Sequence, residues 1–416
     1  MISNQLPNLF DLFEQLPDTR LRSEYNMAEI CGGALVMSML KCGSRNNYNN
    51  VKRSSIFCQN FETAFDIFLP HADSFDDVFR KLPPKHLENV RTQLVKHLLE
   101  NKSLRSERLF TGQYLIAVDA TGMSSFTERH CPYCLTKTSK NGVTSYFHYV
   151  LEAKLITQSG LAISLASEFV ENQAERNFNK QDCEQKAFKR IAEKIKKTFP
   201  RLPICLLADG LYPNKKVFDL CEKFNWSFII TLKDKTLKSF QEEVNLLKGK
   251  VKERKGVKED KHNIISRKYQ YLNDIEYKNN KYTWASCIET VTNKKTQKLT
   301  EKQFVYITNI EQSLENIVET ISSGRLRWII ENQGFNTQKN AGYELEHKFS
   351  RVNYNAMQNY YLILQIAHLI NQLIEKSNTI ILLLKVDSKM TIKNLWSLLL
   401  AYLRFFVHNS TEIYNE

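Results

Sequence analysis

Two acidic residues stand where side chains could bind divalent metal ions. Asp119 follows the apolar run 114–118, and Asp209 follows the apolar run 204–208. Short apolar runs are typical of strands buried on both faces, and a carboxylate at the end of a central strand lies at the rigid edge of a sheet, open to substrate. Two carboxylates and substrate phosphate oxygens would suit Mg²⁺, a hard ion that prefers oxygen ligands.

A third carboxylate would complete a two-metal site, and Glu331 is the candidate. We predict a helix over residues 325 to about 339. Steps of four, four and three residues place on one face of it Arg327, Glu331, Phe335 and Gln338. A cation and an acid would thus be presented together.

Each of these residues has a simpler interpretation when it is taken alone. Asp119 or Asp209 could cap a turn after a strand. Arg327 and Glu331 could be a solvated ion pair on a helix surface. Three acids placed in suitable elements are less easily accidental, and together they favour a metal site.

The elements that must position these acids form a mixed α/β layer. Strands are predicted at 114–118, 146–156 and 161–165 as an antiparallel meander, and two more at 204–208 and 226–231. Helices are predicted at 179–199 and 214–224, between the later strands. Two of the five strands are followed directly by the candidate acids.

Composition changes along the chain suggest five segments. The first is helical, the second holds the mixed layer, the third is a β-rich insertion with a strongly basic run at 248–261, and the last two are helical. Helices are expected in the last two at 313–321, 325–339, 354–376 and 391–407. The segment boundaries are 1–105, 106–232, 233–310, 311–378 and 379–416.

Three short motifs carry a resemblance to a known family. They are Val118-Asp119-Ala120-Thr121-Gly122, Ala208-Asp209-Gly210-Leu211-Tyr212 and Arg327-Trp328-Ile329-Ile330-Glu331, with a long insertion between the last two. Over roughly residues 15 to 375 the sequence resembles the DDE transposases of bacterial insertion sequences, in particular the cut-and-paste, insertion sequence four-like group. The resemblance implies a ribonuclease H-like mixed sheet flanked by helices, with an all-helical N-terminal domain and a β-rich insertion.

The resemblance also implies a reaction and its residues. The reaction is phosphoryl transfer on DNA with two Mg²⁺ ions, for which Mn²⁺ could substitute. Asp119 would bridge both ions, Asp209 and Glu331 would each hold one, and Arg327 would steady a phosphate. The family's last acid belongs to a Tyr, Arg, Glu, Lys pattern, whose tyrosine position is Gly324 here.

The lysine position of that pattern is Gln338, and Lys339 follows one residue later, about 100° away on a helix. Lys339 is therefore a candidate phosphate contact. Trp328 could stack on a displaced base, although core packing is the alternative interpretation. The basic run could line a phosphate track or be a solvated face. The candidate DNA contacts are Arg327, Lys339, Trp328, Lys250, Lys252, Arg254 and Lys255.

The net charge, the apolar stretches and the first residues of the sequence indicate the binding partners and the cellular compartment of the protein. The chain carries 58 Lys and Arg against 45 Asp and Glu, a net charge of +13 that favours nucleic acid. Its longest apolar stretches, near 380–384 and 397–402, fall short of the roughly 20 residues that span a bilayer. Residues 1–20 do not resemble a secretory signal. We expect a cytoplasmic protein that associates with the bacterial nucleoid when bound to DNA.

The cysteine pattern suggests one further site. Nine cysteines are scattered along the chain, and most are expected to be reduced and buried. Cys131 and Cys134 form a Cys-x-x-Cys beside His130, and with His148 they could provide part of a tetrahedral zinc site. The alternative is a tight turn whose thiols pack together.

Three function classes follow from these observations. The first is an active transposase acting on the terminal inverted repeats and target DNA, as a homodimer when bound to DNA. The second is a DNA-binding protein of transposase descent that has lost its chemistry. The third is a ribonuclease H-like nuclease that cuts without joining strands.

Overall fold

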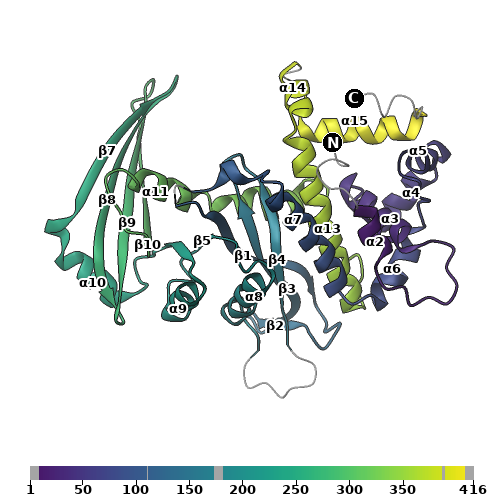
Figure 1. Cartoon of the computed structure of the whole chain (residues 1–416), viewed down its shortest axis with the longest axis horizontal. Helices are drawn as coiled ribbons and strands as arrows, with labels where there is room; N and C mark the ends of the chain where they lie inside the picture. Colours follow the sequence, from purple (N-terminus) through teal and green to yellow (C-terminus); the bar gives the residue numbers. More distant parts are fainter. Residues whose placement is uncertain (1–8, 110, 173–180, 387–388, 408–416) are drawn as a thin grey trace.

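The computed structural model of the chain describes residues 9–109, 111–172, 181–386 and 389–407. The N-terminal segment is helical, as predicted (Figure 1). Its most fully buried helix begins with a capping box, in which Asn26 accepts a hydrogen bond from the backbone of Glu29 at 2.9 Å and Glu29 accepts one from the backbone of Asn26 at 2.7 Å. The helices are α2 (Leu9–Glu14), α3 (Met27–Met39), α4 (Arg45–Lys52), α5 (Ser55–Phe65), α6 (Ala72–Lys81), α7 (Lys85–Glu100) and the 3-10 turn η1 (Arg105–Glu107).

The centre of the molecule is a mixed, mostly antiparallel sheet. Its strand order is β2-β3-β1-β5-β6-β10-β9-β8-β7, and β4 also pairs with β3. The first six strands are β1 (Tyr114–Phe126), β2 (Leu135–Thr138), β3 (Thr144–Ile156), β4 (Ala162–Val170), β5 (Ile204–Ala208) and β6 (Ser227–Thr231). This mixed α/β architecture agrees with the predicted fold class.

The first strands form the predicted antiparallel meander, and the next two run parallel to β1. β1 pairs with β3 and β3 with β4, both antiparallel, whereas β5 lies parallel to β1 and β6 parallel to β5. Helix α8 (Glu184–Thr198) connects β4 to β5, and α9 (Lys215–Phe224) connects β5 to β6. The helix predicted at 179–199 is α8, although residues 179–180 lie outside the described residues.

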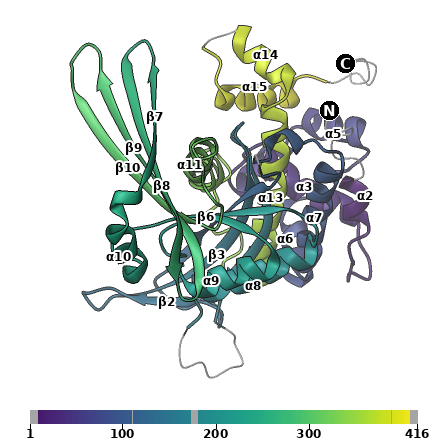
Figure 2. The same cartoon turned by 60° about the vertical axis from the view of Figure 1, so that its left-hand side comes forward.

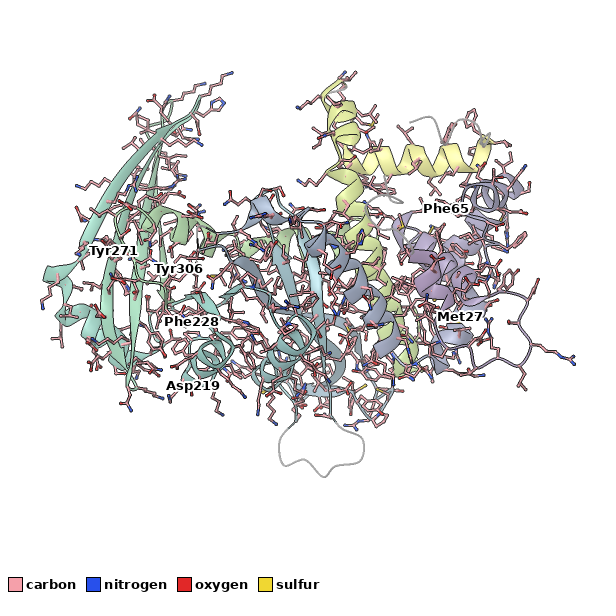
Figure 3. The ribbon with its side chains drawn as sticks, viewed as in Figure 1. Met27, Phe65, Asp219, Phe228, Tyr271 and Tyr306 are labelled. Atoms are coloured by element: carbon pink, nitrogen blue, oxygen red, sulfur yellow. The ribbon has the colours of Figure 1, made fainter. Side chains whose placement is uncertain are left out.

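The β-rich segment after residue 232 extends the central sheet. Strand β10 pairs antiparallel with β6, so that Phe228 on β6, Tyr306 on β10 and Tyr271 on β8 follow one another across the sheet (Figure 3). The long strands of this segment project away from the helices of the core (Figure 2). Its elements are α10 (Lys238–Leu246), η2 (Lys248–Lys250), β7 (Lys252–Glu259), β8 (Asn263–Tyr277), β9 (Asn280–Asn293) and β10 (Leu299–Thr308).

The chain then returns to the core as a bent helical run, which corrects the prediction of two regular helices at 313–321 and 325–339. The run consists of α11 (Ile317–Arg325), a turn, the π-helix η3 (Ile330–Asn336) and α12 (Thr337–Asn340). A π-helix turns more slowly than an α-helix, so side chains on either side of it are rotated relative to regular spacing. Gly334 lies inside η3, where low helix propensity favours such a departure.

Helix α13 (Tyr354–Glu375) joins the N-terminal helices to the sheet. Val95 of α7, Leu165 of β4 and Ile363 of α13 belong to one hydrophobic cluster. The N-terminal helices and the α/β layer therefore share a core across the predicted boundary at 105. Helices α14 (Asn378–Val386) and α15 (Ile392–Phe405) follow, and α15 lies against α5, where Asn60 donates hydrogen bonds to its last carbonyls.

No helix among the described residues is long and apolar enough to cross a membrane.

Candidate active site

Asp119 lies within β1, seven residues before the strand ends at Phe126. The sequence prediction that the strand ends at Asp119 is wrong, because β3 continues to pair with β1 as far as Phe126. The parallel neighbour β5 is shorter and ends at Ala208. Asp119 therefore lies where the parallel part of the sheet ends, which leaves one side of its carboxylate accessible; its side chain is 22% exposed.

Asp209 directly follows β5, the parallel neighbour of β1. The last parallel pair is Ala117 with Leu207, and Asp119 and Asp209 each lie two residues beyond it along the chain. Side chains alternate along a strand, and Ala117 and Leu207 belong to one hydrophobic cluster. Asp119, which lies within β1, therefore projects from the same face of the sheet as that cluster, and Asp209 is near enough that the charges of both aspartates act on Tyr149.

The helical run that carries Glu331 covers this same face. Ile330 and Phe335 of η3 pack in the cluster with Ala117 and Leu207. Glu331, next to Ile330, lies at the margin of the packing with its side chain 36% exposed. The fold thus brings Glu331 to the edge of the sheet where the two aspartates lie, although it is separated from them by more than a hundred residues of sequence.

Arg327 connects two of the three acids. Its Nη1 lies 3.2 Å from Oδ2 of Asp119, and its Nη2 lies 2.7 Å from Oε1 of Glu331. The predicted i, i+4 contact between Arg327 and Glu331 is confirmed. It is not a solvated surface pair, because the Arg327 side chain is only 9% exposed.

The electrostatics of Asp119 reflect this crowded position. Burial raises the pKa of Asp119 to about 7, and the neighbouring carboxylate of Glu331 acts in the same direction. The backbone N–H of Ala120, which donates to Asp119 at 2.9 Å, and the positive charge of Arg327 oppose the increase in pKa. A divalent cation bound here would offset the cost of ionising Asp119.

Asp209 is balanced by a lysine from the next parallel strand. Nζ of Lys233, two residues after β6, lies 3.2 Å from Oδ2 of Asp209. The lysine chain crosses Gly210 so closely that a Cβ there would lie 2.6 Å from its Cγ, Cδ and Cε. Oδ1 of Asp209 accepts the backbone N–H of Leu211 at 2.8 Å and so caps the turn. The turn-capping role is therefore real and coexists with the position beside Asp119.

The three carboxylates are neighbours but not a compact cluster. Among the described residues, no group that includes these acids has three ligand atoms all within 4.8 Å of one another. Arg327 stands between Asp119 and Glu331, and Lys233 holds Asp209. Two cationic side chains therefore pair with the three carboxylates.

Three further residues near the aspartates were not identified from the sequence. Glu184, at the start of α8, accepts a hydrogen bond from Tyr212 Oη at 2.5 Å, and burial raises its pKa. Burial raises the pKa of Tyr149 to about 12, and the charges of Asp119 and Asp209 add to this effect. Lys233 could have been found because it is the first polar residue after β6, as Asp209 is after β5. Glu184 and Tyr149 gave no such signal.

The other candidates on the helical run have separate positions. Trp328 is 53% exposed, so the alternative interpretation that it packs in the core is wrong. The guanidinium carbon of Arg327 lies over the Trp328 ring, 5.2 Å from the ring centroid. Lys339 pairs with Glu346 at 2.6 Å. Gln338 is fully buried and donates to Gln365 at 2.9 Å.

The basic candidates lie on the outer edge of the sheet. Lys250 belongs to η2, and β7 is the edge strand that carries Lys252, Arg254 and Lys255. All four are exposed. Arg254 donates to the carbonyl of Leu314 at 2.6 Å. Exposed lysines also protect a sheet edge from pairing with other chains, so both interpretations of this run stay open.

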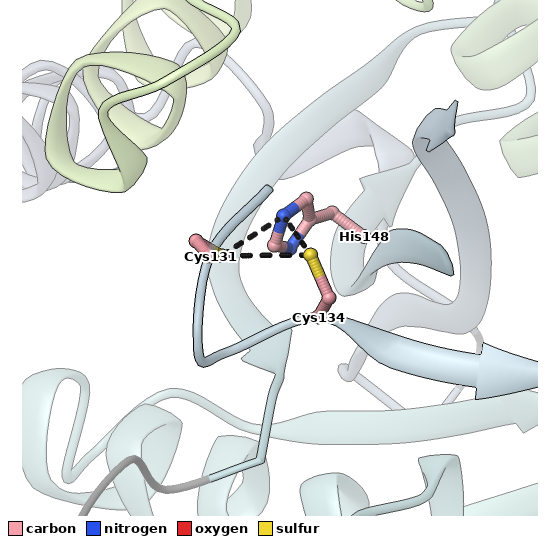
Figure 4. A group of neighbouring side chains, drawn as sticks. All are labelled: Cys131, Cys134 and His148. Carbon is pink, nitrogen blue, oxygen red and sulfur yellow. Dashed lines mark hydrogen bonds between the residues drawn. The ribbon is translucent and has the colours of Figure 1, made fainter. Parts of the chain in front are cut away.

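The predicted cysteine and histidine cluster is formed by the connection between β1 and β2, which carries both cysteines, and by β3, which carries the histidine (Figure 4). Sγ of Cys131 and Sγ of Cys134 lie 3.6 Å apart, and Nε2 of His148 lies 3.4 Å and 3.3 Å from them (Figure 4). Burial lowers the pKa of His148 to about 4 and raises that of Cys131 to about 11. The ligand atoms form the one His, Cys, Asp and Glu group of metal-binding spacing found in the described residues.

No protein-family model matches the sequence, and no curated protein matches it significantly.

Proposed function

We propose that the chain is a DDE transposase of the insertion sequence four-like group, an enzyme that cuts DNA at the ends of an insertion sequence and joins it to a target. One observation carries the proposal: Arg327 links Asp119 of the sheet to Glu331 of the helical run, and Asp209 directly follows β5, the strand that lies parallel to β1. Three acids from distant parts of the sequence thereby share one edge of the sheet.

The topology around these acids supports a ribonuclease H-like core. The order β4-β3-β1-β5-β6 combines three antiparallel strands with two that run parallel to β1. Helices α8 and α9 are the crossovers to the two parallel strands. The first acid lies on the first strand, the second follows the fourth strand of this set, and the third comes from a later helix, which is the arrangement that the resemblance implies.

The donor set fits a hard divalent cation. Asp119, Asp209 and Glu331 would be the ligands, because carboxylate oxygens are preferred by Mg²⁺ and Mn²⁺. When bound, two such ions activate the attacking oxygen and stabilise the leaving oxygen of an in-line phosphoryl transfer. Burial raises the pKa of Asp119 to about 7, and a bound cation would favour its ionised form.

Two positively charged side chains of the protein, Arg327 and Lys233, contact the acids of this site. Arg327 orients Asp119 and Glu331 toward each other, and its planar guanidinium can exchange a carboxylate for a phosphate oxygen. Lys233, 61% exposed, can leave Asp209 at little cost in stability. Exposed Trp328 beside Arg327 offers a ring on which an unpaired base could stack.

The substrate of such an enzyme is double-stranded DNA, both the terminal inverted repeats of the element and the target. The net charge of +13 suits this partner. Two ends must be held together, so we expect a homodimer in the DNA complex, acting on the bacterial nucleoid. Lys250, Lys252, Arg254 and Lys255 are the proposed phosphate contacts of the insertion, and Lys339 is one near the site.

Strand nicking tests the proposal. The purified chain and its Asp119→Asn variant are incubated with Mg²⁺ and a DNA duplex that carries the inverted repeat flanking the coding sequence. We expect the wild type to nick at the repeat end. The nicking rate of the variant should be lower by at least about a hundredfold, because loss of a metal ligand should reduce the rate more than loss of a residue that only orients a ligand. DNA binding should persist in the variant.

The products separate the alternative functions. Joined strands in the presence of target DNA support a transposase, whereas nicking without joining supports a ribonuclease H-like nuclease. Binding without nicking by the wild type, in Mg²⁺ and in Mn²⁺, supports a DNA-binding protein whose chemistry has lapsed.

A further inference from the structure

The cluster of Cys131, Cys134 and His148 lies away from the three carboxylates. His148 pairs with Ser124 across β1 and β3, and Ser124 is five residues beyond Asp119 along β1. At about 3.3 Å per residue this is a separation of about 17 Å along the strand. The cluster is therefore a separate site.

The three ligand atoms have the spacing of a tetrahedral face. Zinc binds sulfur at about 2.3 Å and imidazole nitrogen at about 2.0 to 2.1 Å, so tetrahedral angles would place two sulfurs about 3.8 Å apart and each about 3.6 Å from the nitrogen. The distances here are 3.6 Å between the sulfurs and 3.4 Å and 3.3 Å from Nε2 to them. All three lie within a few tenths of an ångström of the zinc values. A disulfide would instead bring the sulfurs to about 2.0 Å.

The surrounding structure holds these ligands in place. The Cys131 carbonyl accepts the backbone N–H of Cys134 at 3.4 Å, which forms the turn, and Asn172 after β4 donates to the Cys134 carbonyl at 3.2 Å. The His148 ring is stacked on Tyr354 of α13 with centroids 4.8 Å apart, and it is 3% exposed. If the two thiols only packed together in a tight turn, the turn would not require a histidine on β3 whose Nε2 lies near both sulfurs.

We propose that Cys131, Cys134 and His148 bind a structural zinc ion. Each thiol gives its proton to the solvent on binding, so the site releases two protons for each zinc bound. Among the described residues the group consists of Cys131, Cys134 and His148. The fourth ligand is therefore a solvent molecule, or the exposed His130 beside Cys131 after a rotation of its side chain.

The ion would fix the connection between β1 and β2, residues 127–134, onto β3 and the start of α13. Ser125 and Leu135, on either side of this connection, line an open cleft together with Phe147 and Tyr149. Tyr149 is close enough to Asp119 and Asp209 for their charges to raise its pKa. The zinc site would therefore stabilise one wall of the cleft next to the carboxylates without taking part in the chemistry there.

Cobalt titration tests the zinc site directly. Full-length protein is reduced, stripped with a chelator and titrated with Co²⁺, whose thiolate complexes have a charge-transfer band in the near ultraviolet. We expect saturation at one Co²⁺ per chain, displacement of the band by Zn²⁺, and an increase in thermal unfolding temperature when Zn²⁺ is added.

Variants identify the ligands. Cys131→Ser, Cys134→Ser and His148→Gln should each lose the stoichiometric band and the zinc-dependent increase in unfolding temperature, whereas Cys183→Ser, which alters an exposed cysteine elsewhere, should keep both. Circular dichroism compares each variant with the metal-free wild type, so that misfolding is not mistaken for ligand loss. The proposal is overturned if the folded, reduced wild type shows no such band, or if the three ligand variants keep it. These readouts do not depend on DNA cleavage.

Discussion

Arg327 donates a hydrogen bond to Asp119 at 3.2 Å, although 208 residues separate them in the sequence. The contact joins a residue of β1, two positions beyond its last parallel pair with β5, to the helical run that carries the third acid. A buried arginine between two carboxylates is held by geometry that lysine cannot reproduce, because lysine has one nitrogen and arginine has two terminal nitrogens in a plane. This contact is therefore the best place to perturb the site without removing a metal ligand.

Replacement of Arg327 should change both rate and pH dependence. In Arg327→Ala the positive charge that lowers the pKa of Asp119 is absent, so that pKa should rise above its value of about 7 and the pH profile of nicking should shift toward higher pH. Arg327→Lys should restore the charge but not both hydrogen bonds, and the rate should recover only in part. Nicking rates from pH 6 to 9 measure this, and an unshifted profile in Arg327→Ala would argue against the interaction.

Metal affinity should depend on pH in the wild type. Because the pKa of Asp119 is about 7, a proton competes with the cation below that pH. The apparent affinity for Mn²⁺ should fall by about tenfold per pH unit below 7 and change little above about 8. Calorimetric titration with Mn²⁺ at several pH values measures this, with Asp119→Asn as the control that should not show the dependence. A flat profile between pH 5.5 and 7 would contradict the account.

The buried Lys154 packs against the helical run at Gly334. Lys154 is fully buried, donates to Gln365 at 2.6 Å and lies 3.6 Å from the carboxylate of Glu152, while Gln338 also donates to Gln365. Lys154→Met should destabilise the protein by about 3 to 5 kcal/mol, because it leaves a buried carboxylate without one of its partners. Urea unfolding measures the change.

The matched control is an exposed lysine. Lys189 on α8 pairs with Glu193 at 3.9 Å with both side chains exposed. Lys189→Met should change the free energy of unfolding by less than about 0.5 kcal/mol. Equal effects of the two substitutions would show that the buried polar contacts do not contribute as described.

The basic edge strand gives a prediction about salt. If Lys250, Lys252 and Lys255 bind phosphates, the triple alanine variant should bind DNA more weakly, and the slope of log affinity against log salt should decrease by about 0.9 for each phosphate that is no longer neutralised. Fluorescence anisotropy at a series of salt concentrations measures the slope. Alanine at Lys189, Lys197 and Lys216, three lysines of α8 and α9, controls for net charge. Identical slopes for the two variants would mean that β7 is only a protected sheet edge.

Much of the central layer could be predicted because its signals are local. The apolar runs before Asp119 and Asp209 identified β1 and β5, and helical periodicity identified α8, α9 and α13. The end of β1 was missed because strand length is set by the pairing partner: β3 continues beside β1 beyond the point at which β5 stops. That difference in length is a tertiary property.

The remaining features depend on interactions between distant segments. The π-helix around Gly334 could not be predicted from a single glycine. A Cβ added at Gly334 would lie 3.3 Å from the side chain of the buried Lys154. Glu184 contributes to the site through Tyr212, which spacing along the chain does not reveal. The β-rich insertion was recognised, but its continuity with β6 depends on the pairing of Tyr306 with Thr231.

The most direct test of the central claim is the position of bound Mn²⁺ in crystals of the protein with DNA. Anomalous scattering distinguishes this ion from water and from lighter cations. We expect Mn²⁺ to be bound by Asp119, Asp209 and Glu331, with Arg327 displaced from at least one carboxylate. Mn²⁺ bound elsewhere, with Arg327 still joining Asp119 to Glu331 in a DNA complex competent for cleavage, would contradict it.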